Sequence, residues 1–488
     1  MLFNSIDFLF FFPVVVGILF LIPRKLRSIW LLITSYYFYM SWNPKYAVLI
    51  ALSTMITFVS GILLEKCKQN NQRKIVVAGS LLSNLGILAV FKYANFVLNT
   101  IASLANSVGI DFTEKRLDLL LPVGISFYTF QALSYTLDVY RGKIAAEKSI
   151  IRYALFVSFF PQLVAGPIER SGNLLKQIQE IEKTKFWNYT NIRNGLLLMF
   201  WGLFQKLVIA DRASILVNEV YSNCISYGFI EIAIASVLFA FQIYCDFGGY
   251  TNIARGAAQV MGIELMQNFR QPYFAQNIKD FWRRWHISLT SWFTDYLYIP
   301  LGGNRKGELR KNINVLIVFT VSGLWHGASW NFVAWGMLHG IYQIVENAVS
   351  GLKEKMKIDA TKWNAFFAVK IVKAFITFCI VDFAWLFFAA DSFRHAIELL
   401  QRMQTSFRTT SVWELGLSKG HWITLGVALL ILIIVDGFHE KGKSVFEFVN
   451  RQNIVIRWWL YFSLIWGTIM FGVYGVGYDT SQFIYFQF

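Results

Sequence analysis

Long apolar segments separated by short polar turns recur along almost the whole chain. The first three cover residues 8–22, 28–42 and 46–64, and similar segments continue to the C-terminal region. A helix that crosses a bilayer needs about 20 predominantly apolar residues. The pattern therefore predicts an all-α polytopic integral membrane protein with about eleven transmembrane helices at that length, plus re-entrant or interfacial pieces that do not span cleanly.

One membrane-embedded domain is expected over residues 1–488, because the sequence shows neither a soluble domain nor a repeat of fixed period. Residues 1–116 would hold N-terminal spans. Residues 117–350 would form a catalytic core in which the apolar pattern is interrupted, and residues 351–488 would hold C-terminal spans.

Composition supports a membrane protein. The chain is 56% hydrophobic and 15% charged, whereas soluble domains are about 45–50% apolar and about 25% charged. An ordinary cytosolic enzyme is therefore excluded. A net charge of +16 suggests nucleic-acid binding, but the basic residues lie in short loops beside apolar segments, where membrane topology places them. We expect the lipid bilayer, and no nucleic acid, as a partner.

The basic residues also predict the orientation. Residues 24–27 and 66–74 follow the first and third spans and are rich in Lys and Arg, whereas the intervening turn at 43–45 holds one Lys. Short cytoplasmic loops carry the excess of Lys and Arg, so the N-terminus should be extracytoplasmic. Residues 391–421 then fall outside although they carry several Arg, which is an exception in the C-terminal third.

Three segments interrupt the apolar pattern with Gly, Pro or ionisable residues. They cover residues 121–126, 160–170 and 244–250, and the last places Asp246 beside two glycines. Broken helices persist at membrane depth only where protein or a water-filled cavity satisfies the freed backbone groups. Each break alone could be a kink between packed helices, but three together favour a cavity entering the bilayer.

Residues 279–300 predict an amphipathic helix rather than a span. Apolar and aromatic residues recur every three to four positions, with Arg and Ser between them. The Trp-Arg-Arg-Trp sequence at 282–285 could be only an interfacial anchor, since Trp and Arg collect at that depth. His286 comes next and is either an interface residue or a group turned into a cavity.

His326 lies near the far end of a predicted span at residues 312–330. Lys311 marks the cytoplasmic start of that span, and a straight helix would place His326 about 22 Å from it. An ionisable residue at that depth is costly and is a functional-site candidate. The alternative is a neutral histidine hydrogen-bonded between helices. His339, in a following span at 332–349, is interpreted as structural.

Motifs for other chemistries are absent from the sequence. It contains no GxSxG elbow, phosphate-binding loop, HExxH or metal-ligand spacing, so neither a metal nor a bound cofactor is expected. The four Cys lie in or beside apolar segments and are interpreted as packed thiols.

Six segments in order resemble the membrane-bound O-acyltransferase family and, within it, the bacterial alginate O-acetyltransferase branch. They are LPVGISFYTFQ (121–131), VAGPI (164–168), YCDFGGY (244–250), FWRRWHISL (281–289), YIPLGGN (298–304) and SGLWHGASW (322–330). Residues 478–488 are also similar to that branch, whereas residues 391–421 show no likeness.

The resemblance implies many membrane helices around a central tunnel or funnel, with donor and acceptor approaching from opposite faces. By position, His326 matches the principal catalytic histidine of the family. His286 matches a second active-site position, where eukaryotic relatives often carry Asn. The candidates for the substrate tunnel are Trp325, Trp285, Asp246 and His339.

The resemblance also implies a reaction and its setting. We expect an O-acetyltransferase of the bacterial inner membrane that moves acetyl groups from a cytoplasmic donor, acetyl-CoA, to an extracytoplasmic polysaccharide such as alginate. A separate extracytoplasmic esterase-like protein would complete transfer to the sugar. Peptidoglycan O-acetylation and teichoic-acid D-alanylation are enzymatic alternatives, and a membrane transporter is the non-enzymatic one.

Histidine suits the chemistry of such a reaction. Its ordinary pKa of about 6.5 lies close to working pH, so a buried neutral imidazole can accept the proton of an attacking hydroxyl. His286 could polarise the thioester carbonyl, with indole N–H groups or backbone amides as further oxyanion donors. Because no Ser or Cys carries the motif of an acyl-enzyme nucleophile, direct transfer is expected.

Overall fold

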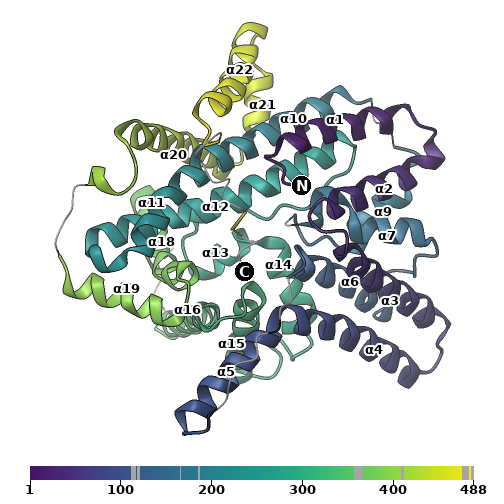
Figure 1. Ribbon diagram of the computed structural model, residues 1–488, viewed down its shortest axis with the longest axis horizontal. Coiled ribbons are helices and arrows are strands. Elements are labelled where there is room, and N and C mark those ends of the chain that lie inside the picture. The colour runs from purple at the N-terminus through teal and green to yellow at the C-terminus, as the bar shows by residue number, and fades with distance from the viewer. Residues whose placement is uncertain are drawn as a thin grey trace. The chain divides into compact units, whose positions relative to one another are not determined.

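The computed structural model describes residues 1–111, 117, 121–164, 166–184, 187–356, 366–407, 412–474 and 483–484 (Figure 1). Every regular element in those ranges is helical, which confirms the predicted all-α class. The helices form two compact units, and the prediction of one acyltransferase domain over the whole chain stays a prediction.

The first unit consists of Met1–Met199 and Ile253–Met266. Helices α3 and α4 pack on α6 and α2 packs on α7, so α6 and α7 are largely buried. The α-helices of this unit are α1 (Ile6–Leu21), α2 (Arg27–Met40), α3 (Tyr46–Lys66), α4 (Asn70–Leu88), α5 (Ala94–Ser107), α6 (Ile125–Tyr140), α7 (Ile150–Ser158), α8 (Phe160–Leu163), α9 (Lys176–Gln179) and most of α10 (Tyr189–Leu203).

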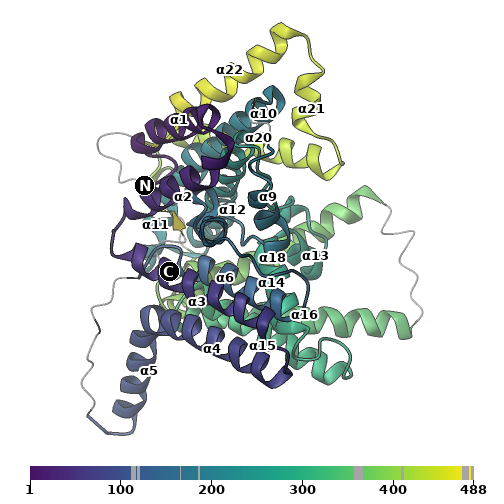
Figure 2. The same ribbon diagram turned by 90° about the vertical axis from the view of Figure 1, so that its right-hand side faces the viewer.

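The second unit consists of Phe200–Asn252 and Gln267–Phe488. Its most extensive helix pair is α15 with α16, which lie side by side in Figures 1 and 2. The α-helices of this unit are α11 (Asp211–Ser222), most of α12 (Phe229–Val260), α13 (Ile278–Arg284), α14 (Ile287–Phe293), α15 (Glu308–His326), α16 (Trp330–Lys355), α18 (Phe367–Ala389), α19 (Phe393–Thr405), α20 (Lys419–Glu440), α21 (Val445–Asn450) and α22 (Ile454–Phe471).

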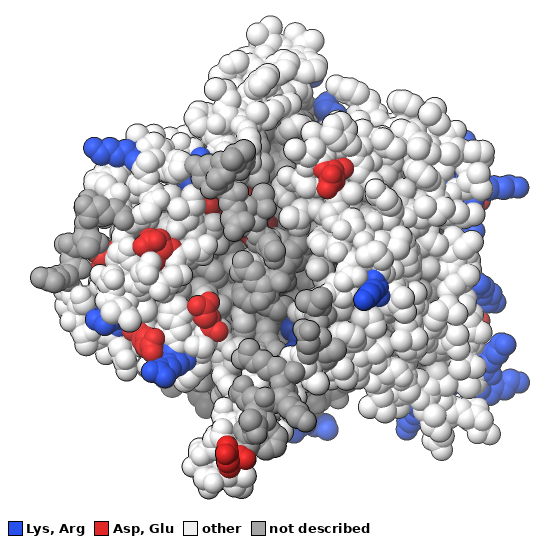
Figure 3. All heavy atoms as spheres, viewed as in Figure 1, with Lys and Arg blue, Asp and Glu red and all other residues white. Residues whose placement is uncertain are grey.

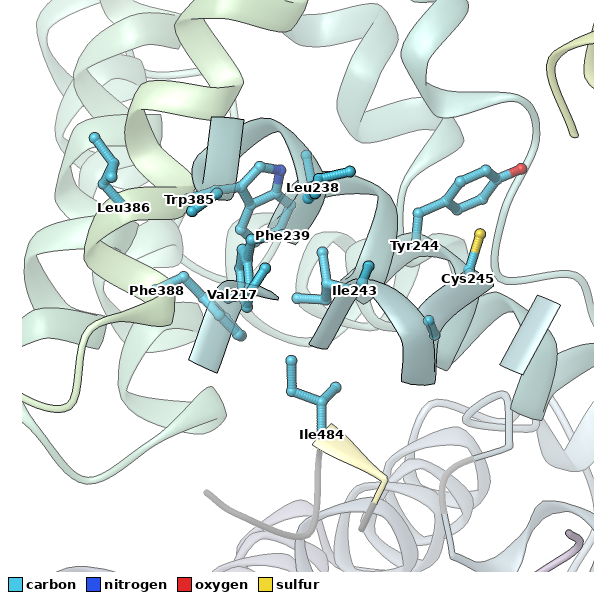
Figure 4. Packing of buried hydrophobic residues seen from close by; sticks show 14 of the residues in the cluster. Val217, Leu238, Phe239, Ile243, Tyr244, Cys245, Trp385, Leu386, Phe388 and Ile484 are labelled. Atoms are coloured by element: carbon cyan, nitrogen blue, oxygen red, sulfur yellow. The ribbon is translucent and has the colours of Figure 1, made fainter. Parts of the chain in front are cut away.

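A large apolar core holds the second unit together. Trp385 and Phe388 of α18 pack their rings against Phe239 of α12. Figure 4 shows Ile243, one turn further along α12, with the side chain of Ile484 directed towards it. Residues from the middle and the very end of the chain therefore share one core.

Seven helices in the described ranges are long and apolar enough to cross a membrane, which supports a multi-pass membrane protein. They are Tyr46–Lys66, Asn70–Ser107, Tyr189–Ser222, Phe229–Val260, Ala368–Ala389, Lys419–Glu440 and Ile454–Phe471. Helices α15 and α16, both predicted as spans, are not among them, because their polar side chains lower the mean hydropathy. The number eleven is therefore not confirmed.

Much of the surface is apolar, as expected for a protein embedded in a membrane. Large apolar side chains such as Leu82, Ile423 and Trp459 are exposed. On the face drawn in Figure 3, charged side chains are sparse and uncharged residues fill broad areas between them. Such a surface would be a liability in water and is expected in lipid.

Two of the three predicted helix breaks are confirmed. Gly124 has a φ of 74° and precedes α6 directly, and a Cβ at this position would lie 2.7 Å from the carbonyl oxygen of Leu163. The second break begins where α8 ends at Leu163, and the buried residues Ile168 and Glu169 follow it outside any helix. In the first unit, both breaks are thus packed against protein.

The third predicted break is wrong. Residues 244–250 lie inside the continuous helix α12. Gly249 serves helix packing instead, because a Cβ there would lie 2.6 Å from the carbonyl oxygen of Gly202. Gly249 therefore allows close approach of a neighbouring helix rather than a change of chain direction.

Candidate active site

The hairpin of α15 and α16 positions His326. Helices α15 and α16 approach each other closely at Gly323 and Gly336. A Cβ on Gly336 would lie only 3.2 Å from the Cα of Gly323. A Cβ on Gly327 would collide with the ring of Phe332. Glycines at these positions let α15 end at His326 and let the chain return immediately along α16.

His326 is the last residue of α15 and is buried among aromatic rings. Its ring centroid lies 5.0 Å from that of Trp325, 5.1 Å from Trp335 and 5.4 Å from Phe388. Helices α15, α16 and α18 therefore all contribute to its surroundings.

His286 lies at a sharp turn where a continuous helix was predicted. The predicted amphipathic helix over 279–300 is wrong at this point, because α13 ends at Arg284 and α14 begins at Ile287. His286 adopts a left-handed backbone with φ 44° and ψ 52°. This conformation is uncommon for a residue with a side chain, although His is one of the types that adopt it more often.

The turn brings the two predicted catalytic histidines together. The ring centroids of His286 and His326 are 6.0 Å apart, and the ring centroid of Phe247 lies 4.7 Å from that of His286. His286 is completely buried, and burial lowers the pKa of its imidazole to about 3. At pH 7 this imidazole is therefore neutral, and in that form its N–H can still donate a hydrogen bond.

The three aromatic tunnel candidates lie at different distances from this pair. Trp325 contacts it, with its ring centroid 5.9 Å from His286. Trp285 packs instead on Phe269 and Trp385, with ring centroids 4.9 and 5.0 Å away. His339 is completely buried, and its Nδ1 accepts a hydrogen bond from Trp282 Nε1 at 3.3 Å.

Asp246, the fourth tunnel candidate, lies in a buried ionic cluster. Lys206 Nζ is 2.8 Å from Asp246 Oδ1 and 2.7 Å from Asp211 Oδ1. The second carboxylate oxygen of Asp246 accepts a hydrogen bond from the backbone N–H of Ile484 at 2.7 Å. Its contacts are thus with the protein, while a role in the tunnel stays a prediction.

A cavity of about 310 Å³ approaches the two histidines from one side. Its lining includes Leu289 and Thr290, about one turn after His286 on α14, and Ser322, one turn before His326 on α15. Ser322 and His326 are four residues apart on a helix, which corresponds to about 6 Å along its axis. The cavity therefore ends about one helical turn short of the pair.

The outer lining of this cavity is cationic. Lys279, Arg283 and Lys311 line it together with apolar residues such as Val315, and no Asp or Glu is among its lining residues in the described part of the chain. Lys311 also contacts Glu308 at 3.0 Å. An apolar cavity with basic residues suits a ligand that combines an anionic group with an apolar or weakly polar end.

A buried polar group beside His286 was not predicted. Asn268, Ser288 and Thr251 are linked by side-chain hydrogen bonds. The sequence pattern places Ser288 only on the polar side of an amphipathic helix and does not mark Asn268 or Thr251. Asn268 lies in a short polar stretch between two apolar segments. In the sequence such a stretch looks like an ordinary loop, because its contacts with distant residues are visible only in the structure.

Comparisons with known proteins identify the family of this chain. Residues 145–388 match the family model of the membrane-bound O-acyltransferase family, and this stretch includes both histidines. A "Peptidoglycan O-acetyltransferase" of Helicobacter pylori is 35% identical over 450 residues, covering 87% of this chain and 78% of the relative.

Two further relatives carry different acceptor names. A "Probable alginate O-acetylase" of Pseudomonas putida is 33% identical over 439 residues, covering 88% of this chain and 85% of the relative. A "Teichoic acid D-alanyltransferase" of Bacillus subtilis is 27% identical over 296 residues, covering 57% of this chain and 71% of the relative. The chain is an acyltransferase and belongs to the membrane-bound O-acyltransferase family.

Proposed function

We propose that the protein transfers acetyl groups from a cytoplasmic thioester donor, acetyl-CoA, towards the hydroxyl groups of an extracytoplasmic polysaccharide. The observation that carries the proposal is the pair of buried histidines, 6.0 Å apart between ring centroids, about one helical turn beyond the nearest lining residues of a cavity with basic residues. Relatives named as O-acetylating enzymes for alginate and for peptidoglycan support acetyl as the transferred group.

His326 acts as the general base in this proposal. It takes the proton from the attacking hydroxyl while the hydroxyl oxygen forms a bond to the thioester carbonyl carbon. His286 polarises the carbonyl oxygen or orients the substrate. When the tetrahedral intermediate collapses, the carbon–sulfur bond breaks, and the proton on His326 passes to the departing thiolate. Aromatic rings around the pair keep bulk water from competing with the acceptor.

The cavity would receive the donor. Lys279, Arg283 and Lys311 match the phosphates of CoA, and the apolar walls along α15 match its acyl arm. Lys311 belongs to the end of α15 that the distribution of basic residues predicts to be cytoplasmic. His326 lies at the other end of the same helix, so an acetyl group that reaches it from the cytoplasmic side has moved most of the way across the bilayer.

The acceptor would be reached from the opposite side. We propose a location in the bacterial inner membrane with an extracytoplasmic N-terminus, and an extracytoplasmic esterase-like partner that completes transfer to the sugar. Cysteine labelling at the exposed residues Lys25 and Lys74 should require a permeable reagent, whereas Lys45 should react from outside. The reverse labelling would overturn the orientation.

Membrane vesicles test the reaction directly. Vesicles that contain the protein should transfer label from [acetyl-¹⁴C]CoA into an esterase-like partner or polymer, and His326→Ala vesicles with equal protein content should not. Chemical analysis of secreted polysaccharide and of purified cell wall from an expressing strain then assigns the acceptor. Transfer that is unaffected by His326→Ala would overturn the proposal.

Variants of the cationic lining test the donor site. Arg283→Gln and Lys311→Gln should raise the KM for acetyl-CoA and leave kcat nearly unchanged, because they would remove contacts made equally before and during the reaction. Arg310→Gln is the matched control, since Arg310 is exposed on α15 and does not line the cavity. Equal KM values for all three variants would place the donor elsewhere.

D-alanylation of teichoic acid is the second candidate. The relative named for that activity matches a shorter part of the chain at lower identity than the O-acetylating relatives. A D-alanyl donor in place of acetyl-CoA in the vesicle assay distinguishes the two, and label transferred only from the D-alanyl donor would replace acetyl by D-alanyl in the proposal.

A further inference from the structure

The backbone at His286 is held in a left-handed conformation, which is uncommon for any residue with a side chain. A left-handed backbone costs roughly 1–2 kcal/mol for a residue with a Cβ. Such strain persists only where the surrounding structure enforces it, and it concentrates at functional sites. Contacts around the turn must therefore hold His286 at its φ of 44°.

Backbone hydrogen bonds enclose the turn on both sides. The N–H of Arg270 donates to the carbonyl of Arg284 at 2.9 Å, before His286. The N–H of Ile287 donates to the carbonyl of Asn268 at 2.9 Å, directly after it. Residues 268–270 thus run beside residues 284–287, and His286 lies between the two bonds.

The side chain of Asn268 adds a second layer of restraint. Its Oδ1 accepts a hydrogen bond from Ser288 Oγ at 2.6 Å, and its Nδ2 donates to Thr251 Oγ1 at 3.2 Å. All three residues are buried. Since the amide oxygen faces a hydroxyl donor and the amide nitrogen a hydroxyl acceptor, the two bonds define one orientation of the amide.

The bond to Thr251 connects the turn to the helix that packs on the imidazole. Thr251 lies one turn after Phe247 on α12, and the Phe247 ring is 4.7 Å from His286. Asn268 therefore fixes the start of α14 to α12, while the histidine between them is directed towards His326.

We propose that Asn268 is a positioning residue for acyl transfer, whose amide holds His286 in the left-handed conformation that brings its imidazole to His326. The inference rests on the proposed function, because it assigns Asn268 an effect only through His286. If the amide instead served only to satisfy buried polar groups, its loss would weaken the fold whatever residue occupied position 286.

A double-mutant cycle separates these roles. Asn268→Ala should lower kcat for acetyl transfer by about 10–100-fold, since a displacement near 1 Å in a reacting group costs on that order. The KM for acetyl-CoA should not change. In a His286→Ala background, the same substitution should lower the residual kcat by less than about two-fold, because coupled residues are not additive. Equal losses in both backgrounds would overturn the proposal.

Thr251 provides a milder test in case Asn268→Ala lowers folding yield. Thr251→Val keeps the shape and removes the hydroxyl, whereas Thr251→Ser keeps the hydroxyl and removes a methyl group. Thr251→Val should lower kcat several-fold, and Thr251→Ser should stay close to the unaltered protein. The opposite order would mean that packing, not the hydrogen bond to Asn268, matters at this position.

Asn84 is the matched control. It is buried on α4 in the first unit, accepts a hydrogen bond from Ser53 Oγ at 2.6 Å and donates to the carbonyl of Ser80 at 2.9 Å. Asn84→Ala should lower thermal stability in detergent about as much as Asn268→Ala and leave kcat unchanged. A similar fall of kcat in both variants would make the effect of Asn268 a general one and overturn the proposal.

The outcomes also separate this inference from the proposed function. If His286→Ala and His326→Ala strongly lower transfer while Asn268→Ala and Thr251→Val keep full kcat, only the positioning role fails. If His286→Ala and His326→Ala transfer acetyl groups normally, the proposed function fails and the positioning role fails with it.

Discussion

Around Lys206, the second unit buries one ammonium group between two carboxylates, whereas around His326 it buries two imidazoles among aromatic rings. Lys206 lies within 2.8 Å of a carboxylate oxygen on each of Asp211 and Asp246. The two imidazoles have Phe247, Trp325, Trp335 and Phe388 as ring neighbours instead.

The comparison suggests how to separate a structural polar cluster from a reactive one. Charges that are buried together compensate each other, and removing one leaves the others at high cost. An imidazole buried among rings stays neutral, and burial lowers the pKa of His286 accordingly. We therefore expect substitutions in the ionic cluster to change stability first and substitutions in the histidine pair to change activity first.

The largest effect is expected for His326→Ala. Loss of the general base should lower acetyl transfer by at least about 10²–10⁴-fold. Protein abundance and the apparent melting temperature in detergent should change little, because helix packing supplies most of the stability of a membrane bundle. Labelled acetyl transfer and thermal unfolding, measured on the same preparation, provide the check. A large fall in melting temperature would place His326 with the structural residues.

Lys206→Met is the corresponding test of the ionic cluster. It leaves two buried carboxylates without their shared ammonium group, which should cost about 3–5 kcal/mol of stability. Replacing Asp211 and Asp246 by Asn in the same variant should recover part of the lost melting temperature. If Lys206→Met kept its melting temperature and lost acetyl transfer, the ionic cluster would be reactive rather than structural, contrary to this comparison.

Arg394→Met is the control for that variant. Arg394 pairs with Glu398 at 3.0 Å on α19, and its side chain is 90% exposed. Exposed ion pairs contribute little to stability, so this variant should unfold at the same temperature as the unaltered protein. A fall equal to that of Lys206→Met would show that burial does not explain the difference.

A smaller effect is expected when His286 becomes Asn rather than Ala. His286→Ala should lower kcat by about 10²–10³-fold, as loss of an oxyanion donor does. His286→Asn should lose less, because Asn tolerates a left-handed backbone and its amide still forms hydrogen bonds. Gln271→Ala is the control, since Gln271 has a φ of 42° and no imidazole. Equal kcat values for His286→Ala and His286→Asn would remove the hydrogen-bonding role.

Much of this arrangement could be predicted from the sequence because it depends on local pattern. Apolar runs indicated the helices, and the depth of His326 along its helix marked it as a candidate before the resemblance was considered. The resemblance paired it with His286, and the ring-centroid distance of 6.0 Å agrees with that pairing.

The remaining features depend on contacts between residues far apart in the chain. The glycines at 248–249 indicated a broken helix, but α12 continues through both, and Gly249 lies where a neighbouring helix approaches. The turn at His286 was missed because the apolar period continues through it, while bonds from residues 268–270 interrupt the helix. Periodicity cannot report a hydrogen bond from a distant segment.

The smallest effect on activity is expected for His339→Ala, which tests whether this histidine belongs to the catalytic group with His286 and His326. His339 is buried between Phe281, Trp282 and Trp335, and it accepts the indole hydrogen bond of Trp282 at 3.3 Å. Its loss leaves that buried N–H without an acceptor, which costs roughly 1–3 kcal/mol. The melting temperature should fall while kcat changes by less than ten-fold, and His339→Gln should recover stability if its amide oxygen accepts the same bond. The contrary result is a His339→Ala variant with an unchanged melting temperature that loses acetyl transfer as completely as His326→Ala. The catalytic group would then contain three histidines. Structural and catalytic imidazoles in this protein would then have the same aromatic surroundings.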